Sequence, residues 1–291
     1  MQVAGFTFIC NAVKYDYPVV EAIRSILPLC QQLYVAVGQS EDGTRDLVAA
    51  IDPQKVVIID TVWDDSQREG GRVLAAETDK AFAAIAPQYD WCFYIQGDEV
   101  LHEQYLSAVQ AAMEGYANNK QVDGLLFSYR HFYGSYDYVA NSSRWYRHEI
   151  RVVRNNKNIF SYRDAQGFRK GNNKKLRVKA VDAWIHHYGW VREPGAMQAK
   201  YNNFGRYWKG DSWAEDQQKT YSGPFDYSLV DSLERYTGTH PQVMQARIAR
   251  MNWQFDRDLS YNRLRLKDRL KNLCERLFGF RPFDYKNYKK I

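Results

Sequence analysis

Short apolar runs alternate with helix-like segments between residues 3 and 95, and this alternation constrains the fold more than any other feature of the chain. The apolar runs lie at residues 3–10, 33–37, 56–60 and 91–95, and the helical patterns between them lie at 18–30, 44–51 and 71–85. Strands that alternate with helices form βαβ units, whose strands lie parallel in one sheet. The sequence therefore predicts an α/β fold with a mostly parallel sheet, in which Thr44 caps the second helix.

The pattern changes at residue 124, where strands typical of antiparallel pairing begin. The further expected strands lie at residues 124–132, 149–154, 176–181 and 183–188. Beyond Pro194 the chain is polar and loop-like, and helical patterns return at 241–255 and 259–278. We therefore expect one α/β domain at residues 1–190, with a mostly parallel mixed sheet flanked by helices, and a C-terminal loop and helical extension at 191–291.

Three features indicate a cytoplasmic protein. The apolar N-terminal run lacks a basic leader and a small-residue cleavage site, so it is expected to form a strand rather than a signal peptide. No stretch approaches the ~18 consecutive apolar residues that a membrane span requires. The four cysteines are widely spaced and form no CxxC pair, which is typical of reduced thiols in a reducing compartment.

The positive charge is concentrated near the C-terminus. The chain carries a net charge of +6, whereas residues 263–290 alone carry +7, so the rest is close to neutral and has no nucleic-acid footprint. Within 263–278, four leucines form one stripe of a basic helix: Leu266, Leu270, Leu273 and Leu277. The stripe either docks onto the rest of the protein or makes a peripheral contact with the inner face of a membrane.

Polar residues follow three of the predicted strands. Ligands bind beyond the carboxyl ends of parallel strands, so we expect Asn11, the turn at 40–44 and the segment 96–99 to meet at one edge of the sheet. Asp98 is the first candidate for binding Mg²⁺ or Mn²⁺ next to a substrate diphosphate, and the alternative role for its side chain is a helix N-cap. In the turn, Gly43 permits a tight bend whose amides are suited to a nucleobase, ribose or phosphate oxygen.

The order of these motifs resembles the family 2 glycosyltransferases of the GT-A fold, especially bacterial members that act on surface polysaccharide or lipopolysaccharide. The resemblance rests on the first strand with Asn11, the Ser-x-Asp-Gly-Thr turn and the strand that ends at Asp98 and Glu99, and it covers roughly residues 3–190. It implies transfer of a sugar, with inversion, from a nucleoside-diphosphate sugar to a hydroxyl of a glycan or lipid-linked saccharide. Family members have an acid where this chain has Gln96, which can still bond a ribose hydroxyl.

The resemblance also implies roles around the donor. His187 belongs to a segment similar to the His-Tyr-Gly-Tyr-like end of the bacterial subgroup, and it is the candidate second metal ligand beside Asp98. Asn11, Glu41 and Asp42 are expected near the nucleotide, although Asp42 can also serve only to stabilise its turn.

The remaining candidates concern the diphosphate, the acceptor and the transferred proton. Arg72, which follows two glycines, is expected near the diphosphate. Trp145 and Tyr146 are expected to form a wall for a sugar ring. Asp164 is the preferred general base and Glu149 the second candidate, although Glu149 can also pair with arginines at i±2 on its strand.

Two other functions remain open at this stage. A nucleotidyltransferase shares the parallel sheet and the acidic metal site, but it usually has a glycine-rich phosphate loop after the first strand, where this chain has Cys10-Asn11-Ala12-Val13. A glycan-binding or nucleotide-binding relative that has lost its metal site is the other alternative, because Gln96 replaces an acid.

Overall fold

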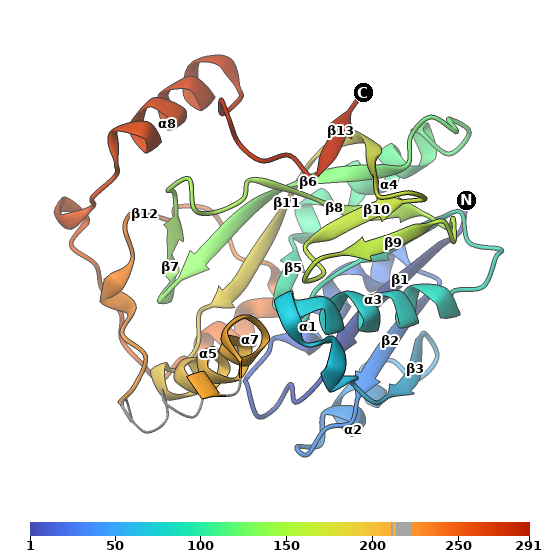
Figure 1. Cartoon of the computed structure of the whole chain (residues 1–291), viewed down its shortest axis with the longest axis horizontal. Helices are drawn as coiled ribbons and strands as arrows, with labels where there is room; N and C mark the ends of the chain where they lie inside the picture. The colour runs from blue at the N-terminus through green and yellow to red at the C-terminus, as the bar shows by residue number, and fades with distance from the viewer. Residues whose placement is uncertain (211, 214–222) are drawn as a thin grey trace.

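The computed structural model of the chain describes residues 1–210, 212–213 and 223–291 (Figure 1). Its first half is a parallel sheet in the order β3-β2-β1-β4. The four strands are β1 (Val3–Ile9), β2 (Gln32–Gly38), β3 (Val56–Thr61) and β4 (Trp91–Tyr94). Each strand coincides with a predicted apolar run to within one residue at either end. All three pairings between them are parallel, so the predicted parallel arrangement is confirmed.

Helices cover both faces of this half-sheet, because side chains of a strand point alternately to its two faces. Val3, Leu33 and Phe93 pack with α1 (Val19–Ile26), whereas Ala4, Phe6 and Tyr94 pack with α3 (Arg72–Ala84).

The short helix α2 (Thr44–Ala49) begins differently from the prediction. Gly43, with φ of +75°, holds the N-cap position, so the expected cap by Thr44 is wrong. The Thr44 hydroxyl instead donates to Asp42 and accepts from the amide of Ala12, 2.7 Å away. It therefore ties the turn after β2 to the loop after β1.

The second half of the sheet is mixed, as expected. Its strands are β6 (Gly124–Tyr133), β8 (His148–Arg154), β9 (Ile159–Tyr162), β10 (Gly167–Lys170) and β11 (Lys174–Trp190). β8 runs antiparallel to both β4 and β6, while β11 runs parallel to β6. The two strands predicted at 176–181 and 183–188 are one strand, whose pairing with β6 shifts register between Ala180 and Trp184.

Short elements at the edges complete the fold. They are β5 (Glu99–Leu101), α4 (Leu106–Gly115), β7 (Ser135–Ala140), β12 (Leu233–Arg235) and β13 (Tyr288–Lys290). β5 and β13 both pair with β11, and β12 pairs with β7. Residues beyond 190 thus add strands to the sheet, and the division into 1–190 and 191–291 stays a prediction.

The C-terminal part differs from its prediction at three places. The segment after Pro194, expected to be loop-like, forms α5 (Pro194–Lys209), since proline suits the first helical turn and the Glu193 carboxylate accepts a bond from the amide of Ala196 at 2.9 Å. The helical pattern at 241–255 forms only α7 (Gln245–Ala249) and a preceding 3₁₀ turn. The helix predicted at 259–278 is confirmed only as α8 (Leu266–Phe278), which follows a 3₁₀ turn at Leu259–Tyr261. No helix in the described ranges is long and apolar enough to cross a membrane.

Candidate active site

A cavity of about 540 Å³ opens beyond the carboxyl ends of β1 and β4. Ile9, Cys10 and Asn11 line it from the end of β1, and Gln96, Gly97 and Asp98 line it from the end of β4. α5 contributes Met197, Lys200 and Phe204 to the opposite wall. The cavity therefore lies where an open parallel sheet binds its ligands.

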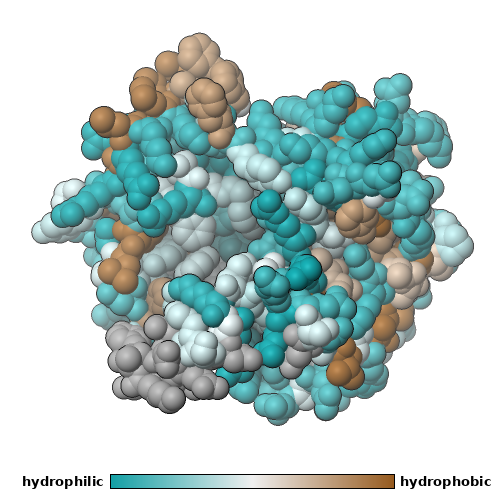
Figure 2. Space-filling view, in the orientation of Figure 1, coloured by the Kyte–Doolittle hydropathy of each residue, from teal (hydrophilic) through white to brown (hydrophobic). Residues whose placement is uncertain are grey.

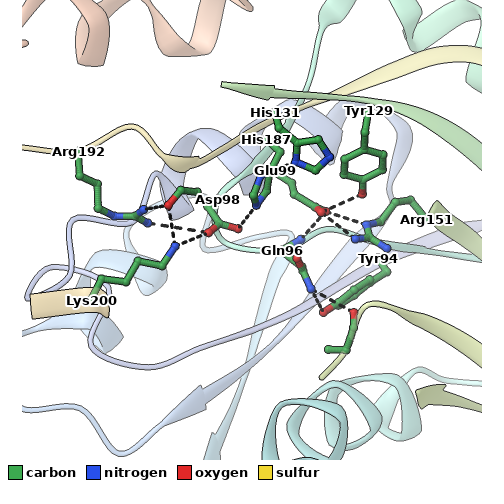
Figure 3. Close-up of polar contacts among 12 residues, drawn as sticks. Tyr94, Gln96, Asp98, Glu99, Tyr129, His131, Arg151, His187, Arg192 and Lys200 are labelled. Carbon is green, nitrogen blue, oxygen red and sulfur yellow. Dashed lines mark hydrogen bonds and ion pairs between the residues drawn. The ribbon is translucent and has the colours of Figure 1, made fainter. Parts of the chain in front are cut away.

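Asp98 lies in this cavity among three nitrogen-bearing side chains (Figure 3). Its Oδ2 is 3.1 Å from Lys200 Nζ and 3.9 Å from the Arg192 guanidinium, and its Oδ1 is 3.7 Å from His187 Nε2. Burial alone would raise the pKa of Asp98, but Lys200, His187 and Arg192 outweigh it and hold that pKa well below its usual value. Asp98 is therefore ionised at neutral pH.

The two cations beside Asp98 are themselves buried. Burial and the charge of Arg192 lower the pKa of Lys200 to about 8, while Asp98 acts in the opposite direction, so Lys200 is still mainly protonated at pH 7. The Lys200 ammonium also donates to the carbonyl of Gly189 at 2.9 Å. Arg192 has one buried terminal nitrogen without a hydrogen-bond partner. Two cations share one carboxylate here, which leaves positive charge available for an anionic ligand.

Pairing between β5 and β11 brings Asp98 and His187 together. Glu99 lies opposite His187 in the antiparallel ladder, and the amide of Tyr188 donates to the carbonyl of Asp98 at 2.8 Å. At Gly189, a Cβ atom would lie 2.6 Å from the His187 ring and 2.9 Å from the Asp98 carboxylate. Glycine at this position therefore makes room for both side chains.

Hydrogen bonds fix the protonation of His187. Burial lowers the pKa of both His131 and His187, so both rings are neutral at pH 7. The carbonyl of Tyr146, 2.8 Å from His131 Nε2, can only accept, so that nitrogen carries the proton. His131 Nδ1 then accepts from His187 Nδ1, 3.0 Å away. The lone pair of His187 is consequently on Nε2, the nitrogen nearest Asp98 (Figure 3).

This arrangement offers two donors for a metal ion. A histidine that ligates a metal usually donates its other ring N–H to a neighbouring acceptor, as His187 does to His131. Asp98 Oδ1 and His187 Nε2 fit as two ligands, with oxygen atoms of a bound ligand and water completing the shell. Among the described residues, no group of three or more His, Cys, Asp or Glu side chains is placed to hold a metal by itself.

A buried ion pair supports the loop that carries Asp98. The Glu99 carboxylate accepts two hydrogen bonds of 2.7 Å from the Arg151 guanidinium and one of 2.8 Å from the Tyr129 hydroxyl. It also accepts the amide of Gln96 at 3.2 Å. Glu99 thus points away from the cavity and fixes the backbone on either side of Asp98 (Figure 3).

Asp164 is the acid on the other wall of the cavity. Both of its neighbours, Arg163 and Ala165, have left-handed backbone conformations, with φ of +57° and +62°. Gln96 holds this loop by donating to the carbonyl of Ala165 at 3.1 Å, and at Gly71 a Cβ atom would lie 2.7 Å from the Asp164 Cβ. Non-glycine residues in this conformation cost free energy and concentrate at functional sites. Burial raises the pKa of Asp164, which makes it a stronger base than an exposed aspartate.

Comparisons with known proteins give a partial likeness in shape. No protein-family model matches the chain, and no curated protein sequence matches it significantly. Among solved structures, S. aureus TarS 1-349 in complex with UDP-GlcNAc matches at 13% identity and a TM-score of 0.38, over 71% of this chain and 66% of that chain. Glucosyl-3-phosphoglycerate synthase from Mycobacterium tuberculosis, in complex with Mn²⁺, UDP and phosphoglyceric acid, matches at 18% identity and 0.30, over 45% and 43%. The chain spans less than two thirds of either protein, and likenesses of this size establish neither its family nor its function.

Six of the residues predicted from the sequence line the cavity. They are Asn11, Gln96, Asp98, Tyr146, Asp164 and His187. They come from segments as far apart as the end of β1 and the end of β11, which the fold brings to one edge of the sheet. Tyr146 lines the cavity, and its backbone carbonyl also orients the ring of His131.

The turn after β2 lies beside the cavity rather than in its wall. Asn11 Oδ1 accepts the amide of Glu41 at 2.9 Å, and the exposed Glu41 carboxylate pairs with Lys14. Asp42 accepts the amides of Lys14 and Thr44 at 2.6 and 3.1 Å, and it thereby stabilises the turn.

The other three candidates also lie outside the cavity lining. Arg72 is exposed and pairs with Glu69 in the 3₁₀ turn that precedes α3. Glu149 is buried, and the two arginines expected to pair with it pair with other acids, Arg151 with Glu99 and Arg147 with Glu275. Trp145 packs edge-on against Trp190, one layer behind the wall, with ring centroids 5.8 Å apart.

Sequence reasoning missed Lys200 and Arg192, the two cations nearest Asp98. It also missed the aromatic wall, to which Tyr17, Trp63 and Trp213 contribute. Glu193 followed by proline is a recognisable helix start and could have pointed to α5. The position of Lys200 beside Asp98, by contrast, depends on how α5 packs across the open edge of the sheet.

Proposed function

We propose that this protein is a glycosyltransferase with a GT-A-like fold, which binds a nucleoside-diphosphate sugar in the cavity at the ends of β1 and β4. One observation carries the proposal: an ionised aspartate at the edge of a parallel sheet is held between two buried cations, in a cavity with aromatic walls. A diphosphate supplies the negative charge that these cations bind, and aromatic rings pack against a base or a sugar ring.

Lys200 and Arg192 have the roles of diphosphate ligands in this proposal. As the bond between the sugar and the diphosphate breaks, negative charge develops on the leaving oxygen, and cations fixed beforehand stabilise that charge. Both side chains come from the segment that follows β11, so they are placed by the same strand that carries His187.

Asp98 and His187 would hold a divalent cation, Mn²⁺ or Mg²⁺, which supplies further positive charge to the diphosphate when bound. The free lone pair of His187 Nε2 and the unshared Oδ1 of Asp98 support this assignment. A cation between them would replace the 3.7 Å contact with two metal–ligand bonds.

Asp164 would act as the general base. It takes the proton of the acceptor hydroxyl while that oxygen forms a bond to the anomeric carbon and the bond to the diphosphate breaks, with inversion. Its place in the cavity wall and its strained loop support Asp164 over Glu149, which lies outside the cavity lining. The acceptor would be a glycan or a lipid-linked saccharide, and the reaction would take place in the cytoplasm.

A thermal-shift screen of nucleoside diphosphates with and without Mn²⁺ tests donor binding first. A ligand that binds only the folded state raises the melting temperature, so we expect one diphosphate to stabilise the protein. Lys200→Met should remove most of that shift, whereas Glu114→Gln, an exposed change on α4, should leave it unchanged.

Release of nucleoside diphosphate from the donor sugar then tests the chemistry. Asp164→Asn should keep donor affinity within about twofold and lower the rate about a hundredfold or more. Donor binding with no turnover by the wild type would favour the binding relative, and release of pyrophosphate from a nucleoside triphosphate would favour a nucleotidyltransferase. The absence of any shift with all common nucleoside diphosphates would refute the proposal.

A further inference from the structure

α8 presents its apolar face to solvent. Its four leucines keep between 50% and 78% of their surface exposed: Leu266, Leu270, Leu273 and Leu277. Their spacing of four, three and four residues places them in one narrow stripe, because a helix turns by about 100° per residue. Apolar atoms gather at the upper left of Figure 2, where Figure 1 draws α8. The alternative expected from the sequence, in which this stripe docks onto the protein, is therefore wrong.

The opposite, polar face of α8 holds the helix on the protein. Asp268 is buried, and although burial alone would raise its pKa, the neighbouring Ser143 holds that pKa below its usual value. Glu275 accepts from Arg281 at 2.8 Å and lies 3.7 Å from Arg147. This is the reverse of a surface helix in a globular protein, which buries its apolar stripe and exposes its polar face.

The chain after α8 enlarges the apolar surface. Phe278, Phe280 and Phe283 are 67%, 53% and 99% exposed. All three follow the last leucine of the stripe within six residues. Phe283 has a left-handed backbone conformation, with φ of +59°, so the chain changes direction at this residue. Seven large apolar side chains in one short segment form a patch of the kind that marks an interaction surface.

Charge indicates which partner this patch fits. Lys267, Arg269 and Arg276 are exposed beside the leucine stripe, whereas the two acids of α8 face the protein. Leucines flanked by basic side chains, with no acid on the same face, suit a surface that is apolar inside and negatively charged outside. A second copy of this chain would bring the same positive charge to the contact, so it is disfavoured.

We propose that α8 and residues 279–283 dock the protein on an anionic lipid bilayer, with the leucines and phenylalanines inserted and the basic side chains at the headgroups. The inference deepens the proposed function, since it names the surface that would bring the cavity to a lipid-held acceptor. It can be tested without donor or acceptor, so its failure and that of the proposed function are distinguishable.

Co-sedimentation with vesicles is the test. The full chain should bind vesicles of phosphatidylcholine with phosphatidylglycerol, and much less those of phosphatidylcholine alone. Leu270→Gln with Leu273→Gln should weaken binding at least about tenfold, because two inserted side chains are lost. Arg269→Glu with Arg276→Glu should weaken it and reduce its dependence on salt. Val62→Gln, at a valine that is 70% exposed directly after β3, is the control.

The melting temperature and the oligomeric state complete the test. The leucine variant should melt within about 2 °C of the wild type, because Leu270 and Leu273 keep 62% and 50% of their surface exposed. Unchanged vesicle binding by the leucine variant would overturn the proposal. A wild-type dimer that the same variant dissociates, with no binding to either kind of vesicle, would assign the surface to self-association instead.

Discussion

Replacing Glu149 with glutamine should stabilise the protein at pH 8 and change its stability much less at pH 5. Glu149 is 4% exposed, and its Oε2 has no hydrogen-bond partner. Burial, opposed by Arg151 and reinforced by Glu99 and Asp164, raises its pKa from 4.5 to about 8. Between these two values the folded protein holds a proton that the unfolded chain releases. The free energy of unfolding therefore falls as the pH rises through this window.

The size of the effect follows from the shift. Each pH unit across the window corresponds to ~1.4 kcal/mol, so the folded state loses about 4 kcal/mol from this group between pH 5 and pH 8. Glutamine does not titrate, and the variant should therefore gain that amount over the wild type across the same interval. Any cost of the amide itself is the same at both pH values and cancels in the comparison.

Urea unfolding at pH 5, 6.5 and 8, followed by tryptophan fluorescence, measures the difference. Glu114→Gln, which removes an exposed carboxylate from α4, controls for the loss of one negative charge. A stability difference between Glu149→Gln and the wild type that is the same at all three pH values would show that Glu149 is ionised in the folded state, and would refute the reasoning.

Two further predictions follow from the support of the site. Arg151→Met should destabilise the fold by about 3–5 kcal/mol in urea unfolding, since Glu99 would be left as a buried charge without its partner, and adding Glu99→Gln should recover part of the loss. Gly189→Ala should lower the affinity for a nucleoside diphosphate at least about tenfold by calorimetry, because its Cβ would displace the ring of His187. Gly115→Ala, where a Cβ atom meets nothing within 4 Å, should leave that affinity unchanged.

The parallel half of the sheet could be predicted because each strand is an apolar run bounded by polar turns. β5, β12 and β13 could not, since each has only three residues and exists through pairing with a strand far away in sequence. β11 was divided in two because Lys179 and Asp182 interrupt its apolar pattern. α5 was missed because its residues are mainly polar or aromatic, and a proline start with a glutamate cap defines it instead of an apolar stripe.

The sequence predicts those site residues that neighbouring residues or a family motif identify. Asp98 follows a buried strand, and the resemblance pointed to His187, so both could be proposed from the sequence. Lys200 lies 102 residues from Asp98 in the chain, and the contact between them depends on the packing of α5. Glu149 was expected near the reacting groups, but the alternation of β8 directs it toward the interior. The sequence shows which residues share a face of a strand, but it does not show how deeply each face is buried.

The return of the chain to the sheet after α8 makes this helix a span anchored at both ends rather than a free tail. Before it, Asn262 bonds the backbone of Leu233 at 3.0 and 2.7 Å, and after it β13 pairs with Leu176, Arg177 and Val178 of β11. β11 also carries His187. Covalent connection and strand pairing therefore fix the distance and the orientation of the cavity relative to any surface that α8 binds. A loose linker would leave both variable.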